Sequence, residues 1–206
     1  MMRQIVLGVA AACCAVGTAF AAPGDDNKIQ GTEKLASVNE NTRGDIDKAQ
    51  RKFEYATARF YDFRTVPEDD AKKAYGAFKN EVDEFVKQVN DARNKIVSAE
   101  RDAAVYFANW EADDSLMTDT KRRERSQRRR AAAQAAFQAH LDAFKSIQNI
   151  WDSGMTILLE QVTLLKDNHA GRTAPAAMEA GDRVQRLAED AYWDVDNVFS
   201  KTELFD

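Results

Sequence analysis

Basic side chains are concentrated in one short stretch of this 206-residue sequence, where they could bind an anionic partner. Seven of the ten residues from 121 to 130 are basic: Lys121, Arg122, Arg123, Arg125, Arg128, Arg129 and Arg130. We call these seven residues the basic cluster. Helical spacing would distribute them around most of a helix. Because the arginine fork matches carboxylate and phosphate oxygens, the cluster and the nearby Trp110 form our candidate binding site.

Two interpretations of the basic cluster are open at this point. In the first, it docks onto an anionic surface, such as phospholipid or lipopolysaccharide headgroups or an acidic protein, while nearby apolar residues enter the interface. Those apolar residues are Tyr106, Phe107, Trp110, Leu116 and Met117. In the second, acidic residues of a facing helix neutralise the arginines and the aromatic residues only cap a helical core, which is the commoner outcome for long charged helices. Those acidic residues are Glu100, Asp102, Glu111, Asp113 and Asp114.

Residues suited to catalysis or metal binding are scarce. The histidines are His140 and His169, neither follows a glutamate by three residues, and no Cys-x-x-Cys-His motif occurs. Carboxylate-bridged metal sites and attached haem therefore have no support in the sequence. We expect structural roles for both histidines, no catalytic residue, no metal and no cofactor, and hence a protein that is not an enzyme.

The first 21 residues have the features of an export signal. Arg3 precedes an uncharged apolar stretch of sixteen residues, 5–20, and Ala-Phe-Ala at 19–21 is a small-x-small cleavage site. That stretch is shorter than the roughly 20 residues of a spanning helix, so we expect export to the periplasm of a Gram-negative bacterium. Lipid attachment at Cys13 is the alternative. Cleavage would leave no cysteine and 28 basic against 34 acidic residues, which argues against nucleic-acid binding.

Apolar residues recur at alternating spacings of four and three from residue 71 to residue 110. The twelve positions are Ala71, Tyr75, Phe78, Val82, Phe85, Val89, Ala92, Ile96, Ala99, Ala103, Tyr106 and Trp110. A repeat of 3.5 residues sustained over more than five heptads predicts a coiled-coil seam. We therefore expect one long helix from Pro67 to about Ser115, with proline at its first position.

The remaining pattern predicts three further helices and no strand. We expect a flexible polar leader at 22–41 and a helical domain at 42–206, with helices at about 42–64, 67–115, 118–169 and 173–206. Short turns make sequence neighbours antiparallel. The predicted fold is therefore all-α: an elongated antiparallel helical bundle whose two long central helices form a coiled-coil hairpin, with two shorter flanking helices packed on one half.

Small residues are predicted to line the uncovered half of this hairpin. There Ala92, Ala99 and Ala103 would face the alanines of the other long helix, since small side chains let helices approach closely. Those alanines are Ala131, Ala132, Ala135, Ala136 and Ala139. In the covered half, Gly154 costs helix stability, so it is expected either to admit a bulky neighbour such as Phe78 or to mark a kink.

Two segments resemble a known family. From Phe107-Ala108-Asn109-Trp110 to the stretch at 161–168 (Gln-Val-Thr-Leu-Leu-Lys-Asp-Asn), the chain resembles the bacterial Domain of Unknown Function 2959 family. The resemblance extends over about residues 42–205 and implies an exported, wholly helical protein. It supplies no established catalytic or binding residue.

These patterns favour a binding function. We expect a non-enzymatic scaffold or interaction protein of the cell envelope that presents a coiled-coil hairpin with a basic end, and that binds a protein partner or associates with itself. The alternative is a peripheral membrane-binding protein that docks on anionic lipid or lipopolysaccharide through the arginine-rich end.

Overall fold

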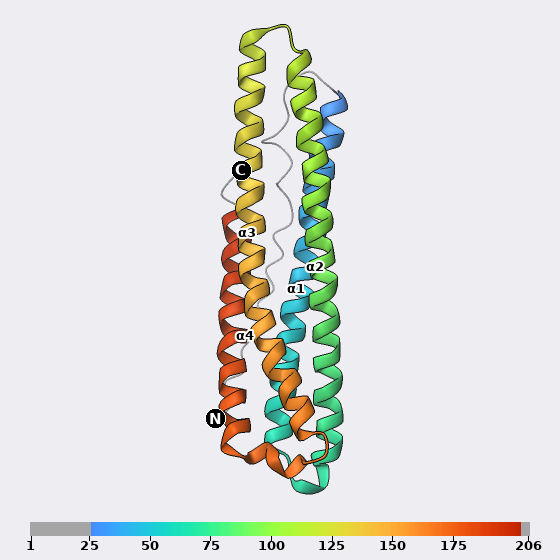
Figure 1. Ribbon diagram of the computed structural model, residues 1–206, viewed down its shortest axis with the longest axis vertical. Helices are drawn as coiled ribbons and strands as arrows, with labels where there is room; N and C mark the ends of the chain where they lie inside the picture. The colour runs from blue at the N-terminus through green and yellow to red at the C-terminus, as the bar shows by residue number, and fades with distance from the viewer. Residues whose placement is uncertain (1–25, 203–206) are drawn as a thin grey trace.

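Four α-helices form an elongated antiparallel bundle (Figure 1). The structure is a computed structural model that describes the backbone of residues 26–202 and the side chains of residues 42–197. The helices are α1 (Asp26–Thr65), α2 (Ala71–Leu116), α3 (Thr120–Leu165) and α4 (Pro175–Thr202), with 3₁₀ turns η1 (Glu68–Asp70) and η2 (His169–Thr173). No strand occurs in the described backbone, so the predicted all-α bundle is confirmed. The expected export signal at 1–21 lies outside the described residues.

The predicted seam of α2 is buried. All ten of its positions from Ala71 to Ala103 are buried, and beyond them Phe107 is buried while Tyr106 and Trp110 are half-buried. α2 and α3 contain 46 residues each and are therefore each about 69 Å long. They meet in a turn at residues 117–119, which we call the tip, and the opposite end of the bundle is the base.

Helix α1 is longer than the sequence led us to expect. It begins at Asp26 instead of Thr42, so residues 26–41 of the expected flexible leader are helical. No proline occurs between Pro23 and Pro67, so nothing in this stretch forces a helix to stop. Figure 1 shows the first turns of α1, in blue, beside the half of α2 that leads to the tip. The expectation of two short flanking helices is therefore wrong for α1, which has 40 residues.

Helix α4 does cover only one half of its neighbour, as predicted. It has 28 residues, and Figure 1 shows it alongside the basal half of α3. Its buried face consists mainly of small residues, including Ala177, Ala180, Gly181, Val184 and Ala188. Among the described residues, the turns of α3 nearest the tip consequently have no fourth helix beside them.

The five alanines of α3 that were predicted to line the seam do not do so, which corrects the prediction for the uncovered half. Four of them, Ala131, Ala132, Ala135 and Ala139, are exposed, and Ala136 is half-buried. The reason is the heptad register: steps of seven from buried Trp151 lead to Phe144 and Phe137, which are also buried. These larger side chains, together with Ala133 and Leu141, occupy the seam, and most of the alanine run falls on the outer face.

Aromatic side chains fill the basal half of the core. Phe53 of α1 stacks on Phe85 of α2 with ring centroids 4.7 Å apart, and Phe60 stacks on Phe78 at 4.9 Å. A Cβ atom added at Gly154 of α3 would lie 2.2 Å from Cζ of Phe53. Gly154 thus admits Phe53 from α1, and the expected partner Phe78 is wrong.

Candidate functional site

The basic cluster lies in the first turns of α3, next to the tip. Asp119 caps this helix by accepting a hydrogen bond from the backbone N–H of Arg122 at 3.1 Å. Two members of the cluster, Arg123 and Arg130, are half-buried. The other five are exposed: Lys121, Arg122, Arg125, Arg128 and Arg129.

Arg130 is neutralised inside the fold. Its guanidinium lies 3.1 Å from an Oε2 of Glu111 and 3.3 Å from an Oδ2 of Asp114, both on α2. The side chain of Arg130 is 14% exposed and that of Asp114 is 2% exposed, so their charges meet away from solvent. The neutralisation interpretation therefore holds for this arginine, which ties α3 to α2.

The five exposed cations are arranged differently. None of them forms an ion pair with a carboxylate among the described side chains. Nε of Arg125 and Nε of Arg128 instead donate to backbone carbonyls one turn earlier, each at 3.4 Å. Glu100, one of the acidic residues expected to neutralise the cluster, instead pairs at 2.8 Å with Lys145, which lies farther from the tip on α3. The free charge of the cluster is therefore directed to solvent.

Trp110 contributes to the fold of the tip. Its Nε1–H donates to Oγ of Ser126 at 2.8 Å, and its ring meets that of Tyr106 edge-on at 5.8 Å. Both polar and apolar parts of this tryptophan thus have partners within the α2–α3 hairpin. Leu116, at the end of α2, is the strongly exposed apolar residue of the tip, with 81% of its surface accessible.

The two histidines lie apart from each other and pack against aromatic rings. His140 is half-buried beside Phe144, and burial lowers its pKa. His169 contacts the ring of Tyr75 with centroids 4.9 Å apart, and its Nδ1 lies 2.9 Å from the Leu165 carbonyl oxygen. Within the described residues, no group of three or more His, Cys, Asp or Glu side chains could hold a metal ion.

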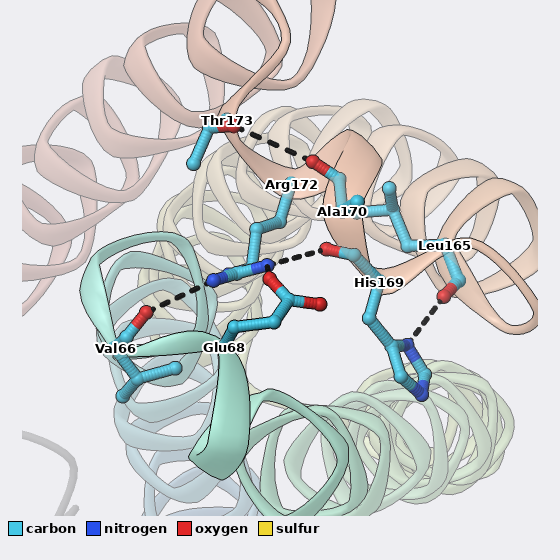
Figure 2. A network of polar contacts seen from close by, with 7 residues as sticks. All are labelled: Val66, Glu68, Leu165, His169, Ala170, Arg172 and Thr173. Atoms are coloured by element: carbon cyan, nitrogen blue, oxygen red, sulfur yellow. Dashed lines mark hydrogen bonds and ion pairs between the residues drawn. The ribbon is translucent and has the colours of Figure 1, made fainter.

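A second polar cluster, at the base, was not foreseen from the sequence (Figure 2). Arg172 of η2 is buried and donates to a carboxylate oxygen of Glu68 at 2.7 Å, to the Val66 carbonyl at 3.1 Å and to the His169 carbonyl at 2.9 Å. These bonds join the α1–α2 connection to the α3–α4 connection. Because they use both terminal nitrogens of Arg172, we assign this cluster to the fold and not to ligand binding.

Comparison with known proteins gives a family and no close relative. No helix of the described residues combines the length and the apolar character needed to cross a bilayer. The chain matches no curated protein and no solved structure. A family model described as a protein of unknown function does match, over residues 29–196. The resemblance seen in the sequence is thus confirmed, and the chain belongs to the DUF2959 family.

Proposed function

We propose that this chain is a non-enzymatic scaffold or interaction protein of the cell envelope, which binds a partner protein through the basic cluster. The observation that carries the proposal is the difference between the paired Arg130 and the exposed members of this cluster. Arg130 is paired with two carboxylates in the fold, whereas five neighbouring cations are exposed without such a partner among the described side chains. An acidic protein surface is the ligand chemistry that suits them.

The packing of the hairpin supports a role for these cations outside the fold. The rings of Phe107 and Phe137 meet at 6.3 Å across α2 and α3, and Trp110 bonds to Ser126, so the two helices are joined without the exposed arginines. Like charges three or four residues apart on a helix repel one another. An anionic partner would relieve that repulsion, so the exposed cations favour the binding of such a partner.

Photocrosslinking in intact cells tests the proposal, with a photoreactive residue at the exposed position Gln127. We expect a protein adduct at this position that is lost when Arg125 and Arg129 are replaced by glutamine. The matched control is Thr156, which is exposed on the same helix near the base and should give no adduct of that mass. An adduct that survives the two replacements, or that forms equally at Thr156, would contradict binding through the basic cluster.

The envelope location is part of the proposal and rests on residues 1–21. Export with cleavage after Ala21 predicts a mature chain that begins at Ala22. Mass spectrometry of the protein from fractionated cells measures this directly. An uncut chain found in the cytoplasmic fraction would contradict the location.

Anionic lipid is the second candidate partner, and the exposure of Leu116 is the observation that favours it. This side chain is 81% accessible at the tip, close in sequence to the exposed Lys121 and Arg122. A cation near an anionic membrane contributes about 1 kcal/mol, and an apolar side chain can enter the interface beside it. The chain should then sediment with phosphatidylglycerol vesicles and not with phosphatidylcholine vesicles.

Salt and substitution decide between lipid and protein partners. Binding to anionic vesicles should weaken steeply above about 0.15 M salt, where charges are screened within about 8 Å. Leu116→Asp should weaken it further, whereas Leu164→Asp, at an exposed leucine near the base, should not. No sedimentation with phosphatidylglycerol at low salt would eliminate the lipid candidate.

A further inference from the structure

Helix α4 packs against one flank of α3, and the heptad pattern identifies that flank. Lys145 of α3 pairs with Glu100 of α2 at 2.8 Å, which marks the side of α3 that faces α2. Ile157 and Ile150, buried and half-buried, occupy the heptad position on the other side. Because α4 is the other helix in extensive contact with α3, we infer that α4 packs there. The flank of Ile157 and Ile150 is therefore the α4 side of α3.

The same flank continues beyond the end of α4. Steps of seven from Ile150 toward the tip reach Ala143 and Ala136, both half-buried, and then Arg129 and Arg122, both exposed. The adjacent heptad position carries exposed residues as well. We call four exposed residues of this uncovered flank the α3 ledge: Arg122, Arg125, Arg129 and Ala132.

Hydrogen bonds in the core fix how far α4 reaches. Gln50 donates to the Ala188 carbonyl at 3.1 Å and accepts from Nε1 of Trp151 at 3.1 Å, so Ala188 is level with Trp151. α4 ends at Thr202, 14 residues after Ala188, which is level with about residue 137 of the antiparallel α3. The α3 ledge thus lies beyond the end of α4.

The exposed surface of α4 beyond Ala188 carries the opposite charge. From residue 189 to residue 197 the chain has four acidic residues and no basic one. They surround two exposed aromatic side chains, Tyr192 at 51% and Trp193 at 64% exposure, whose rings meet edge-on at 5.7 Å. We call these six residues the α4 patch: Glu189, Asp190, Tyr192, Trp193, Asp194 and Asp196.

We propose that the α3 ledge binds the α4 patch of a second copy of this chain. This inference rests on the proposed function and identifies the partner protein as the chain itself. The ledge and the patch lie on the α3–α4 side of one rod, separated along its axis. Trp193, five residues after Ala188, is level with about residue 146 of α3, 21 residues or about 32 Å from Arg125. A two-fold axis across the rod midway between them places each ledge on the other copy's patch.

The size of the resulting contact lies at the lower end of the range for stable dimers. The strip from Arg122 to the level of Glu189 spans 28 residues of α3, or about 42 Å. About 22 Å of this strip lies beyond the end of α4, where α3 alone is about 10 Å wide, and along the other 20 Å the two helices are together about 20 Å wide. Each copy would therefore contribute roughly 600 Å², the lower end of the range for a standard interface. Trp193 lies within this strip and supplies the kind of aromatic anchor that dominates binding energy.

Charge exchange between two variants tests the pairing. The purified full chain should be dimeric by light scattering at low salt, and both Arg125→Glu/Arg129→Glu and Glu189→Lys/Asp190→Lys should be monomeric. An equimolar mixture of these two variants should restore a dimer, because each then supplies the charge that the other lacks. Trp193→Ala should raise the dissociation constant tenfold or more.

The matched control changes net charge equally at the base. Lys72 and Lys73 are exposed at the start of α2, and Lys72→Glu/Lys73→Glu should leave the dimer intact. Circular dichroism of every variant verifies that the bundle is folded. A monomeric wild type, a folded mixture that fails to dimerise, or a control that dissociates would each overturn the inference. If the wild type is monomeric while the Gln127 adduct still depends on Arg125 and Arg129, the inference fails and the proposed function stands.

Discussion

Alanine at position 154 should disturb the contact that joins α1 to α3. The added Cβ would lie 2.2 Å from Cζ and 2.5 Å from Cε2 of Phe53, far inside van der Waals contact. The ring of Phe53 is fully buried and stacked on Phe85 with an interplanar angle of 7°, so it has no free space into which to turn. The helices or the ring must therefore shift to accept one methyl group.

Two opposing terms give the size of the effect. Overpacking a well-packed core costs about 1–3 kcal/mol, and the depth of this overlap places Gly154→Ala at the upper end. Alanine in a helix interior gains about 1 kcal/mol over glycine. The free energy of unfolding should thus fall by about 2 kcal/mol, which corresponds to a melting temperature lower by roughly 4–8 °C for a chain of this size.

Urea unfolding followed by far-ultraviolet circular dichroism measures this, with two matched variants. Gly76 of α2 has no atom within 4 Å of an added Cβ, so Gly76→Ala should stabilise the chain by about 1 kcal/mol. In a Phe53→Leu background, Gly154→Ala should also stabilise by about 1 kcal/mol, since only the helix propensity remains. If Gly154→Ala stabilises the wild-type chain as much as Gly76→Ala does, the contact between Phe53 and Gly154 is refuted.

Three further outcomes follow from the tip, the base and the core. Arg130→Gln should lower the free energy of unfolding by about 3 kcal/mol because it leaves the Asp114 carboxylate buried without its cation. Arg129→Gln should change the free energy of unfolding by less than about 0.5 kcal/mol. Equal losses for the two variants in thermal unfolding would contradict the distinction between the paired Arg130 and the exposed Arg129. Arg172→Ala removes three hydrogen bonds and should cost about 2 kcal/mol, with faster hydrogen exchange in residues 66–70 and 169–173 than in the middle of α2. Burial lowers the pKa of His140 from its ordinary 6.5, so the unfolded chain binds more protons below that pH and stability falls as the medium is acidified. The urea midpoint should therefore drop between about pH 7.5 and pH 5.5, and His140→Gln should reduce this drop; an unchanged drop would refute the role of His140.

The periodic apolar pattern predicted most of the bundle correctly. A seam spaced by three and four residues places its members on one helix face, and the ten positions from Ala71 to Ala103 are indeed buried. The tip and the short reach of α4 follow from helix lengths, which Pro67 and Pro175 and the polar turns delimit. These features are local, and local chemistry determines them.

Features that depend on long-range contacts were missed. Arg172 meets Val66 and Glu68 across more than 100 residues of sequence, and no spacing rule connects an arginine in one turn to carbonyls in another. The side chain that packs against Gly154 depends on how α1 is rotated about its own axis, and the periodic pattern does not give that rotation. For this reason Phe78 was expected in place of Phe53.

Two errors had a local cause. The alanines of α3 were assigned to the seam for their size, although the heptad register of Phe137 and Phe144 places most of them outside it. The polar composition of residues 26–41 suggested a flexible leader, yet polar residues without proline are compatible with a helix that continues from a packed one. For the basic cluster, the helix lengths predicted its place at the tip, whereas the pairing of Arg130 depends on which carboxylates of α2 lie beside it.

The direction of the first and last helices has a mechanical consequence. α1 begins toward the tip and α4 ends while running toward it, so both ends of the described backbone lead to the same side of the molecule. Tension between these ends would peel the outer helices from the central pair one turn after another, since their contacts then break in sequence and not together. Such a rod resists stretching between its own ends poorly, and a load transmitted along its length must enter through the turn at the tip and the two connections at the base.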